Sequence, residues 1–173
     1  MRSFEDYAIH FVGLKLGDYQ FEYEIDNAFF DEFDFKEFQK SNIQVVVNLV
    51  KKNTHLEFDF HIKGKVNVEC DLTLEHFDLP IENSLSLVVK FGDDYKEVDE
   101  DLMIIPEGEH DFQIEQFIYE CVVLSLPSKK IHPGVEDGTL DSEILDKLNY
   151  HSIDKNNNKE IDPRWDKLKK LLK

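Results

Sequence analysis

The chain has 173 residues, of which 41% are hydrophobic, so it is long enough to form one domain with a substantial core. No stretch approaches the roughly 18 consecutive apolar residues that a membrane-spanning helix needs, and the N-terminal sequence carries acidic residues where a signal peptide has an apolar run. These features exclude a membrane protein and predict a cytoplasmic one.

The formal net charge of −17 is distributed unevenly along the chain. Residues 155–173 contain seven Lys or Arg and three Asp or Glu, a net charge of +4, so residues 1–154 carry 13 basic and 34 acidic side chains, or −21. An acidic body repels nucleic-acid phosphates and argues against wide, direct contact with RNA or DNA. It suits a basic protein partner, although an acidic surface that only keeps the protein soluble is the simpler explanation.

The first third of the chain predicts three strands and a short helix. Residues 4–16 read as a first strand, and residues 19–25 alternate apolar and polar side chains, so we expect them to return antiparallel to it. Residues 26–39 are ambiguous. One reading is a short helix through Phe33 that Asp26 caps, because its carboxylate accepts free backbone N–H groups. Residues 43–52 are rich in β-branched valines and predict the next strand.

Residues 55–91 show the clearest pattern in the chain. Leu56, Phe58, Phe60 and Ile62 fall on one side of an extended strand, and the alternation resumes beyond Gly64. Because successive side chains of a strand point to opposite faces, this period of two predicts half-buried antiparallel strands. We expect them to form a meander with the valine-rich strand before them.

The rest of the chain predicts mainly helices. Residues 92–110 are acidic with a short apolar run, which predicts a hairpin or an edge strand. Residues 114–126 carry apolar side chains at helical spacing before a proline and predict a helix that packs on the sheet. After a loop at residues 128–139, two shorter helices are predicted at residues 142–148 and 163–173.

Together these elements predict an α+β fold, in which one core helix and short C-terminal helices accompany a mainly antiparallel, curved sheet of six to eight strands. The pattern leaves open whether the sheet closes into a barrel. We expect residues 1–149 to form a single domain, and residues 150–173 to form a polar linker and a short basic helix.

A calcium loop is the one metal motif that the sequence approaches. Asp154, Asn156 and Asn158 have the spacing of the first ligands of such a loop. However, Lys159 replaces the glycine of the sharp turn, and Trp165 replaces the bidentate glutamate. We therefore predict no calcium site.

Other cofactor and catalytic motifs are also missing from the sequence. Cys70 and Cys121 lie far apart, and the seven histidines are scattered, so the paired short spacings of a zinc site are absent. Glycine-rich phosphate loops are absent too. We predict that the protein needs no cofactor and is not an enzyme.

The two cysteines are expected to be free, small, buried side chains. Cys70 falls in the apolar phase of its predicted strand, which indicates burial and low reactivity rather than a thiolate nucleophile. A cysteine-dependent enzyme that pairs Cys70 with a distant histidine is nevertheless kept as one hypothesis.

Basic residues and the single tryptophan gather at the C-terminal end of the chain. The candidate partner-binding residues are Arg164, Trp165, Lys167, Lys169 and Lys170, together with Lys129, Lys130 and His132 after the predicted core helix. The terminal helix either contacts RNA phosphates, with Trp165 stacking on a base, or docks on the acidic body. We favour docking, because an exposed indole is costly.

Three blocks of sequence follow one another in a recognisable order. They read VECDLTLEHFDLPIENSLSLVVKFGDD, then IIPEGEHDFQIEQFIYECVVLSLPSKKIHP, then DPRWDKLKKLL. In this order they resemble the YceD family of large ribosomal RNA subunit accumulation proteins, over residues 68–172. The resemblance implies a bacterial cytoplasmic protein that supports ribosomal RNA accumulation during assembly of the large subunit.

The chain departs from that family at its cysteines. Many members carry C-x-x-C in the first block, where this chain has Cys70 and Thr73. A Cys-Pro often follows the helix block, where this chain has His132 and Pro133. A metal role in the family should therefore not transfer to this chain.

Our first hypothesis is a non-enzymatic factor for large-subunit assembly, which acts through a basic ribosomal protein or a pre-ribosomal particle. Direct contact with RNA and the oligomeric state are left open. The alternative is a β-sheet module that binds a small ligand or a peptide unrelated to the ribosome. A deep apolar pocket lined by Phe58, Phe60 and Val66, rather than filled by them, would favour that alternative.

Overall fold

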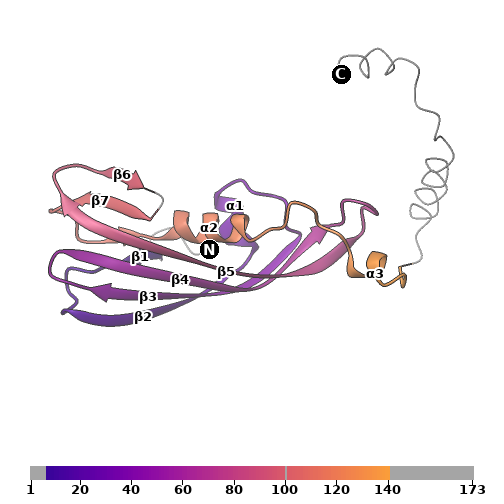
Figure 1. Ribbon diagram of the computed structural model, residues 1–173, viewed down its shortest axis with the longest axis horizontal. Coiled ribbons are helices and arrows are strands. Elements are labelled where there is room, and N and C mark those ends of the chain that lie inside the picture. Colours follow the sequence, from indigo (N-terminus) through magenta and orange to yellow (C-terminus); the bar gives the residue numbers. More distant parts are fainter. Residues whose placement is uncertain (1–6, 100, 141–173) are drawn as a thin grey trace, which may run out of the picture. The chain divides into compact units, whose positions relative to one another are not determined.

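Figure 1 shows the computed structural model, which describes residues 7–99 and 101–140. The described residues fall into two compact units. The larger unit comprises residues 7–69 and 76–130, apart from residue 100, and the smaller one comprises residues 70–75 and 131–140.

A six-stranded sheet forms most of the larger unit (Figure 1). In spatial order its strands are β2 (Gly17–Ile25), β3 (Lys40–Lys51), β4 (His55–Glu69), β5 (His76–Gly92), β7 (Leu102–Pro106) and β6 (Lys96–Asp99). Neighbouring strands are antiparallel except β5 and β7, which are parallel. Because β2 and β6 lie at its two ends, the sheet is not closed into a barrel.

Shorter elements complete the described chain. They are the strand pair β1 (Ala8–Ile9) and β8 (Phe112–Gln113), and the helices α1 (Asn27–Glu32), α2 (Glu115–Leu124) and α3 (Pro133–Glu136). The predicted mixture of helices with a mainly antiparallel sheet is confirmed. The helices expected at residues 142–148 and 163–173, and the linker expected from residue 150, lie outside the described residues.

The predicted meander is formed by β3, β4 and β5, which are adjacent and antiparallel. At the centre of the sheet, Phe60 lies opposite Val47 on one side and Leu85 on the other. The acidic segment after β5 forms the hairpin of β6 and β7, with β6 at the edge of the sheet. Both features follow the period of two and the turn signals of the sequence.

One face of the sheet, here called the inner face, carries the core. Its fully buried side chains on β3 and β4 are Ile43, Val45, Val47, Leu49, Leu56, Phe58, Phe60, Ile62, Val66 and Val68. α2 packs against β4 and β5 and buries Ile118, Cys121 and Val122. The alternate side chains of these strands point to the opposite, outer face, which is polar and largely exposed.

A polar side chain ties α2 to the sheet. The amide nitrogen of Asn83, on β5, donates a hydrogen bond of 2.9 Å to the carbonyl oxygen of Cys121. This carbonyl belongs to the last turn of α2, where helical partners run out. The bond therefore holds the end of the helix at one place on the inner face.

The prediction of a first strand over residues 4–16 is wrong for most of that range. Within the described residues 7–16, only Ala8–Ile9 form a strand, and they pair with β8. The carbonyl oxygens of Phe11 and Leu14 instead accept hydrogen bonds of 2.8 Å from the ammonium group of Lys51. β2 consequently pairs with β3 and not with the first segment.

The two short helices α1 and α3 each begin after a residue whose side chain caps the helix. Asp26 caps α1 as expected, and its carboxylate accepts a 3.0 Å hydrogen bond from the N–H of Ala28. Residues 128–139, expected to be a loop, contain the single helical turn α3. Its N-cap is His132, whose ring nitrogen Nδ1 accepts a 2.9 Å hydrogen bond from the N–H of Gly134. Among the described helices, none is long and apolar enough to cross a membrane.

Candidate partner-binding surfaces

A hollow of about 560 Å³ lies on the inner face between α2 and the hairpin of β6 and β7. Its apolar lining consists of Leu85, Leu87, Tyr95, Leu102, Met103, Phe112, Phe117 and Leu124. Four acidic side chains, Glu97, Asp99, Glu115 and Glu120, and two glutamines complete it. We call this hollow the acidic cleft.

The apolar lining of the acidic cleft continues the core and reaches the surface. Leu87 and Phe112 are buried, and the ring of Phe112 stacks on that of Phe117 with centroids 5.6 Å apart. At the rim, Leu124 is 76% exposed and Tyr95 is 57% exposed. Exposed apolar side chains beside a hollow are typical of a surface that binds a protein partner.

Glu115 is the unusual polar residue of the acidic cleft. It lies in the first turn of α2, where the helix dipole favours a negative charge. Burial raises the pKa of its carboxyl group, and a hydrogen bond to its own backbone N–H opposes the shift. Among the described residues, its Oε2 atom is buried without a hydrogen-bond partner. A buried carboxylate oxygen without a partner is costly, and a positive charge that a partner brings close to the cleft would offset that cost.

The electrostatic character of the acidic cleft is visible at Tyr95. Burial raises the pKa of its phenol, and the negative charges of Glu109, Asp111 and Glu115 raise it further. A phenol that resists ionisation beside three carboxylates indicates a negative local potential. The acidic cleft therefore combines apolar contact area with attraction for positive charge.

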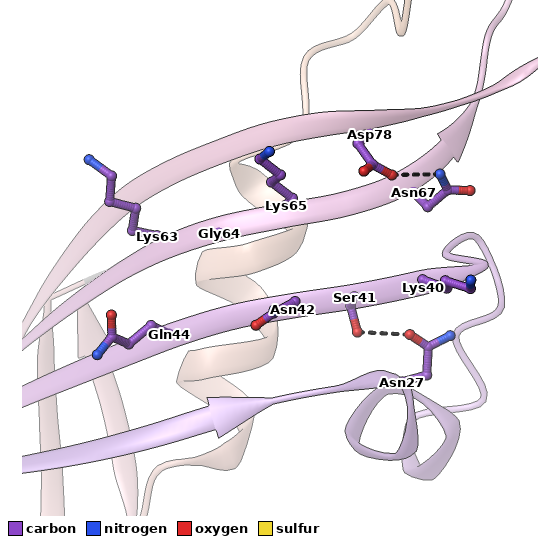
Figure 2. A pocket seen from close by; sticks show the side chains of 10 residues that line it. All are labelled: Asn27, Lys40, Ser41, Asn42, Gln44, Lys63, Gly64, Lys65, Asn67 and Asp78. Atoms are coloured by element: carbon purple, nitrogen blue, oxygen red, sulfur yellow. Dashed lines mark hydrogen bonds between the residues drawn. The ribbon is translucent and has the colours of Figure 1, made fainter.

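A second hollow, of about 740 Å³, lies on the outer face (Figure 2). Its lining is entirely different and consists of Asn27, Lys40, Ser41, Asn42, Gln44, Lys63, Gly64, Lys65, Asn67 and Asp78. We use the name lysine face for Lys40, Lys63 and Lys65 with the amides Asn42, Gln44 and Asn67. Figure 2 shows these side chains along the exposed surface of β3 and β4.

The strand register brings the members of the lysine face together. Lys65 lies opposite Asn42, Lys63 opposite Gln44, and Lys40 opposite Asn67. Directly opposed side chains on one face of an antiparallel pair lie about 5 Å apart at Cβ. The three lysines therefore form one group, although Lys40 is distant in sequence from the other two.

Some members of the lysine face already have partners. Lys63 forms a 2.9 Å ion pair with Glu82, and Asn67 donates a 2.7 Å hydrogen bond to Asp78. Within the described part of the chain, no ion pair or side-chain hydrogen bond engages Lys40 or Lys65. Their ammonium groups face solvent.

Gly64 allows β3 and β4 to approach closely beneath the lysine face. A Cβ atom on Gly64 would lie 2.6 Å from the Cα of Ile43 and closer still to the carbonyl oxygen of Asn42. Residues with a side chain cannot adopt this packing without a shift of the backbone. Gly64 thus keeps β4 continuous through the position where the sequence pattern is interrupted.

The smaller unit contains Cys70 and the groups that surround its thiol. Cys70 does not lie in β4, which ends at Glu69, but opens the turn that leads to β5. Burial raises the pKa of its thiol, but hydrogen bonds to the sulfur from the Thr73 hydroxyl and from backbone N–H groups outweigh burial and hold the pKa below its ordinary value. One of these donors is the N–H of His132, 3.3 Å from the sulfur.

The cysteine environment differs from a nucleophile–base pair. His132 approaches the sulfur with its backbone N–H, and its ring nitrogen Nδ1 is occupied by the N–H of Gly134. Within residues 7–99 and 101–140, no group of three His, Cys, Asp or Glu side chains is placed to hold a metal ion. Both cysteines are free and buried, as expected.

The structure describes three of the partner-binding residues that the sequence singled out. Lys130 forms a 3.2 Å ion pair with Glu37, Lys129 is exposed, and His132 caps α3. Arg164, Trp165, Lys167, Lys169 and Lys170 lie outside the described residues. Phe58, Phe60 and Val66 are at most 1% exposed, so they fill the core rather than line a pocket.

The sequence did not single out Glu115 or the lysine face. Outward-pointing Lys63 and Lys65 were visible in the alternation, but their grouping with Lys40 depends on the strand register. An acidic residue at the start of a predicted helix was visible as well, yet only the packing of β6 and β7 encloses it.

Comparison with known proteins supplies a family. The model of the family described as large ribosomal RNA subunit accumulation protein YceD matches residues 58–172. The matched range includes the whole lining of the acidic cleft, and Lys63 and Lys65 of the lysine face. No curated protein and no solved structure matches the chain.

Proposed function

The chain belongs to the YceD family of large ribosomal RNA subunit accumulation proteins, and we propose that it supports the accumulation of that RNA by binding a basic ribosomal protein in the acidic cleft. The proposed role is that of a binding factor and not of a catalyst. It holds the basic protein apart from wrong RNA contacts until the large subunit is assembled.

The observation that carries this proposal is the buried, unpaired Oε2 atom of Glu115 beside a cleft whose rim exposes Tyr95 and Leu124. A carboxylate in such a place destabilises the free protein, because burial raises its pKa. Natural proteins tolerate such residues mainly where function requires them. A Lys or Arg of a partner, followed by an apolar side chain, would satisfy both parts of the acidic cleft.

The charge of the whole chain supports the same class of partner. At −17, the protein attracts basic proteins over a distance and accelerates their association. Ribosomal RNA is bound by basic proteins, so an acidic factor competes with RNA for the same positive side chains. The acidic cleft adds the apolar contacts that distinguish a specific partner from any basic protein.

The β-sheet module for a small ligand is less well supported. Its apolar pocket would need Phe58, Phe60 and Val66 as a lining, and these side chains are packed in the core. A cysteine enzyme lacks support as well, because the thiol of Cys70 is buried and the Nδ1 atom of His132 caps a helix.

The test is co-purification of the tagged full chain with ribosomal particles and individual large-subunit ribosomal proteins. We expect wild-type protein to co-purify with one or more basic ribosomal proteins at low salt, and to lose them as salt is raised. The double variant Glu97→Gln with Glu115→Gln should lose this binding about tenfold or more, since two charge-assisted contacts disappear.

A matched control removes two charges elsewhere. Asp18→Asn with Glu22→Gln alters exposed side chains on the outer face of β2 and should leave binding close to wild type. Because Glu115 is destabilising where it stands, its variant should melt at the same temperature as wild type or slightly above it. Equal loss of binding in both double variants, or a protein found only in free fractions of growing cells at low salt, would count against the proposal.

A further inference from the structure

We propose that the lysine face binds the sugar–phosphate backbone of double-helical RNA. The observation behind it is a group of three lysines and three amides on the outer face of β3 and β4, around a hollow of about 740 Å³ (Figure 2). This site goes beyond the proposed function. It rests on that function only in taking RNA, and not another polyanion, as the ligand.

The positive charges of the lysine face are open to a ligand. Lys40 and Lys65 lack ion pairs among the described residues, and Lys63 pairs with Glu82 at the surface, where their side chains are 76% and 71% exposed. An exposed pair of this kind is weak and readily exchanges its carboxylate for a phosphate. The three ammonium groups repel one another, and a bound polyanion removes that repulsion.

The amides between the lysines suit the other groups of an RNA backbone. Asn42 and Gln44 lie directly opposite Lys65 and Lys63 in the strand register. An amide side chain both donates and accepts hydrogen bonds, so it can contact a phosphate oxygen or a 2′-hydroxyl group. Lysines alone would attract any anion, whereas this mixture favours a ligand that alternates phosphate with sugar hydroxyls.

The composition of the hollow favours double-helical over single-stranded RNA. None of its ten lining residues is aromatic. Single strands are usually held by bases stacked on aromatic or arginine side chains, and the lining has neither. Recognition is therefore restricted to the backbone, which is how proteins read the shape of an A-form helix.

The rest of the outer face limits the extent of the contact. Beyond Gln44 and Lys63, the outward-pointing residues of β2 and β4 include Asp18 and Glu22, which are exposed, and Asp59, which is half-buried. These carboxylates repel phosphates and confine RNA to the lysine face. A narrow contact is compatible with a chain whose net charge opposes wide binding to nucleic acid.

The experiment measures binding of the purified full chain to a mixed-sequence duplex RNA of about 20 base pairs, over a salt series from about 50 to 200 mM. We expect the double variant Lys40→Gln with Lys65→Gln to bind about tenfold more weakly near 100 mM salt. The slope of log affinity against log salt should fall in magnitude by about two, one for each phosphate contact removed.

The matched control is Lys90→Gln with Lys96→Gln, which removes the same charge from exposed lysines outside the lysine face. It should keep both the affinity and the salt slope of wild type. An equal loss in the two double variants would overturn the site, because it would reflect net charge alone. Equal or tighter binding of single-stranded poly(U), or of polyglutamate, would overturn the assignment to duplex RNA.

Two cross-measurements separate this site from the acidic cleft. The lysine variant should still co-purify with basic ribosomal proteins, and the Glu97→Gln with Glu115→Gln variant should still bind duplex RNA. Failure of RNA binding alone leaves the proposed function standing, and failure of protein binding alone leaves the lysine face standing.

Discussion

Burial raises the pKa of two residues of α2, Glu115 and Cys121, with different consequences for stability. It raises the pKa of Glu115, so the native protein is less stable at neutral pH than it would be with a neutral side chain. It raises the pKa of the Cys121 thiol to about 11, from an ordinary value of 9.0. A thiol is neutral at pH 7, so at that pH burial leaves Cys121 as a small apolar core residue.

The free energy of unfolding should therefore fall between pH 9 and pH 11 through Cys121. Because the native pKa is raised, the contribution of the neutral thiol is complete below the unfolded pKa and is lost as pH rises through the native one. Two pKa units correspond to at most about 3 kcal/mol. Urea unfolding of wild type and Cys121→Ala at pH 7.5, 9 and 10.5, with a reductant present, measures this contribution.

The test compares how steeply the free energy of unfolding falls with pH in wild type and in Cys121→Ala, and not their absolute stabilities. Cys121→Ala loses contacts at every pH, while Tyr23, whose pKa is raised by burial and by Tyr7, contributes equally to both proteins. The variant should show the shallower fall. Parallel curves for the two proteins would mean that the thiol of Cys121 titrates in the native state as it does in the unfolded chain.

At the scale of the element, the close approach of β3 and β4 at Gly64 positions the lysine face. Gly64→Ala would place a methyl group against the backbone of Asn42 and Ile43. We expect a loss of about 1–3 kcal/mol in the free energy of unfolding, because the two strands must separate locally. Urea denaturation of the variant measures this loss.

Gly108→Ala is the matched control, since nothing lies within 4 Å of a Cβ atom at that position. Its stability should stay within about 0.5 kcal/mol of wild type. If Gly64→Ala is as stable as this control, the strands are not held together as closely as the structure describes. A weaker affinity of Gly64→Ala for duplex RNA would further tie the strand geometry to the lysine face.

The elements differ in how far the sequence predicts them. β3, β4 and β5 follow from alternation, since every second side chain is needed by the same core. The pairing of β1 with β8 joins two-residue segments that are distant in sequence, and no local pattern encodes it. Residues 10–16 do not continue the strand that their sequence predicts. The carbonyl groups of Phe11 and Leu14 instead accept hydrogen bonds from Lys51, a contact that only the folded chain creates.

The candidate site was harder to predict than the fold for the same physical reason. Glu115 reads in the sequence as an ordinary helix-start residue, and its burial depends on β6 and β7. Lys63 and Lys65 read as a solvated strand face, and Lys40 joins them through register. Charges that gather from separate elements become visible only once the pairing of those elements is known.

At the scale of the whole molecule, the two proposed binding surfaces occupy opposite faces of one sheet. The acidic cleft lies on the inner face beside α2, and the lysine face lies on the outer face of β3 and β4. Under the two proposals, one sheet would hold a basic protein segment and an RNA backbone at the same time without bringing the two into contact. Such separation suits a factor that keeps a protein and its RNA apart during assembly.

The net charge of −17 predicts opposite effects of salt on stability and on binding. Repulsion among the carboxylates destabilises the folded chain, and its range shrinks from about 10 Å at 0.1 M salt to about 3 Å at 1 M. Raising sodium chloride across this range should therefore increase the melting temperature by several degrees. The same screening should weaken binding of ribosomal proteins to the acidic cleft and of duplex RNA to the lysine face.

Sorbitol at matched osmolarity is the control, because it does not screen charge and should leave both affinities nearly unchanged. A melting temperature that falls with salt would mean that attractive ion pairs, and not repulsion, dominate the electrostatics of this fold.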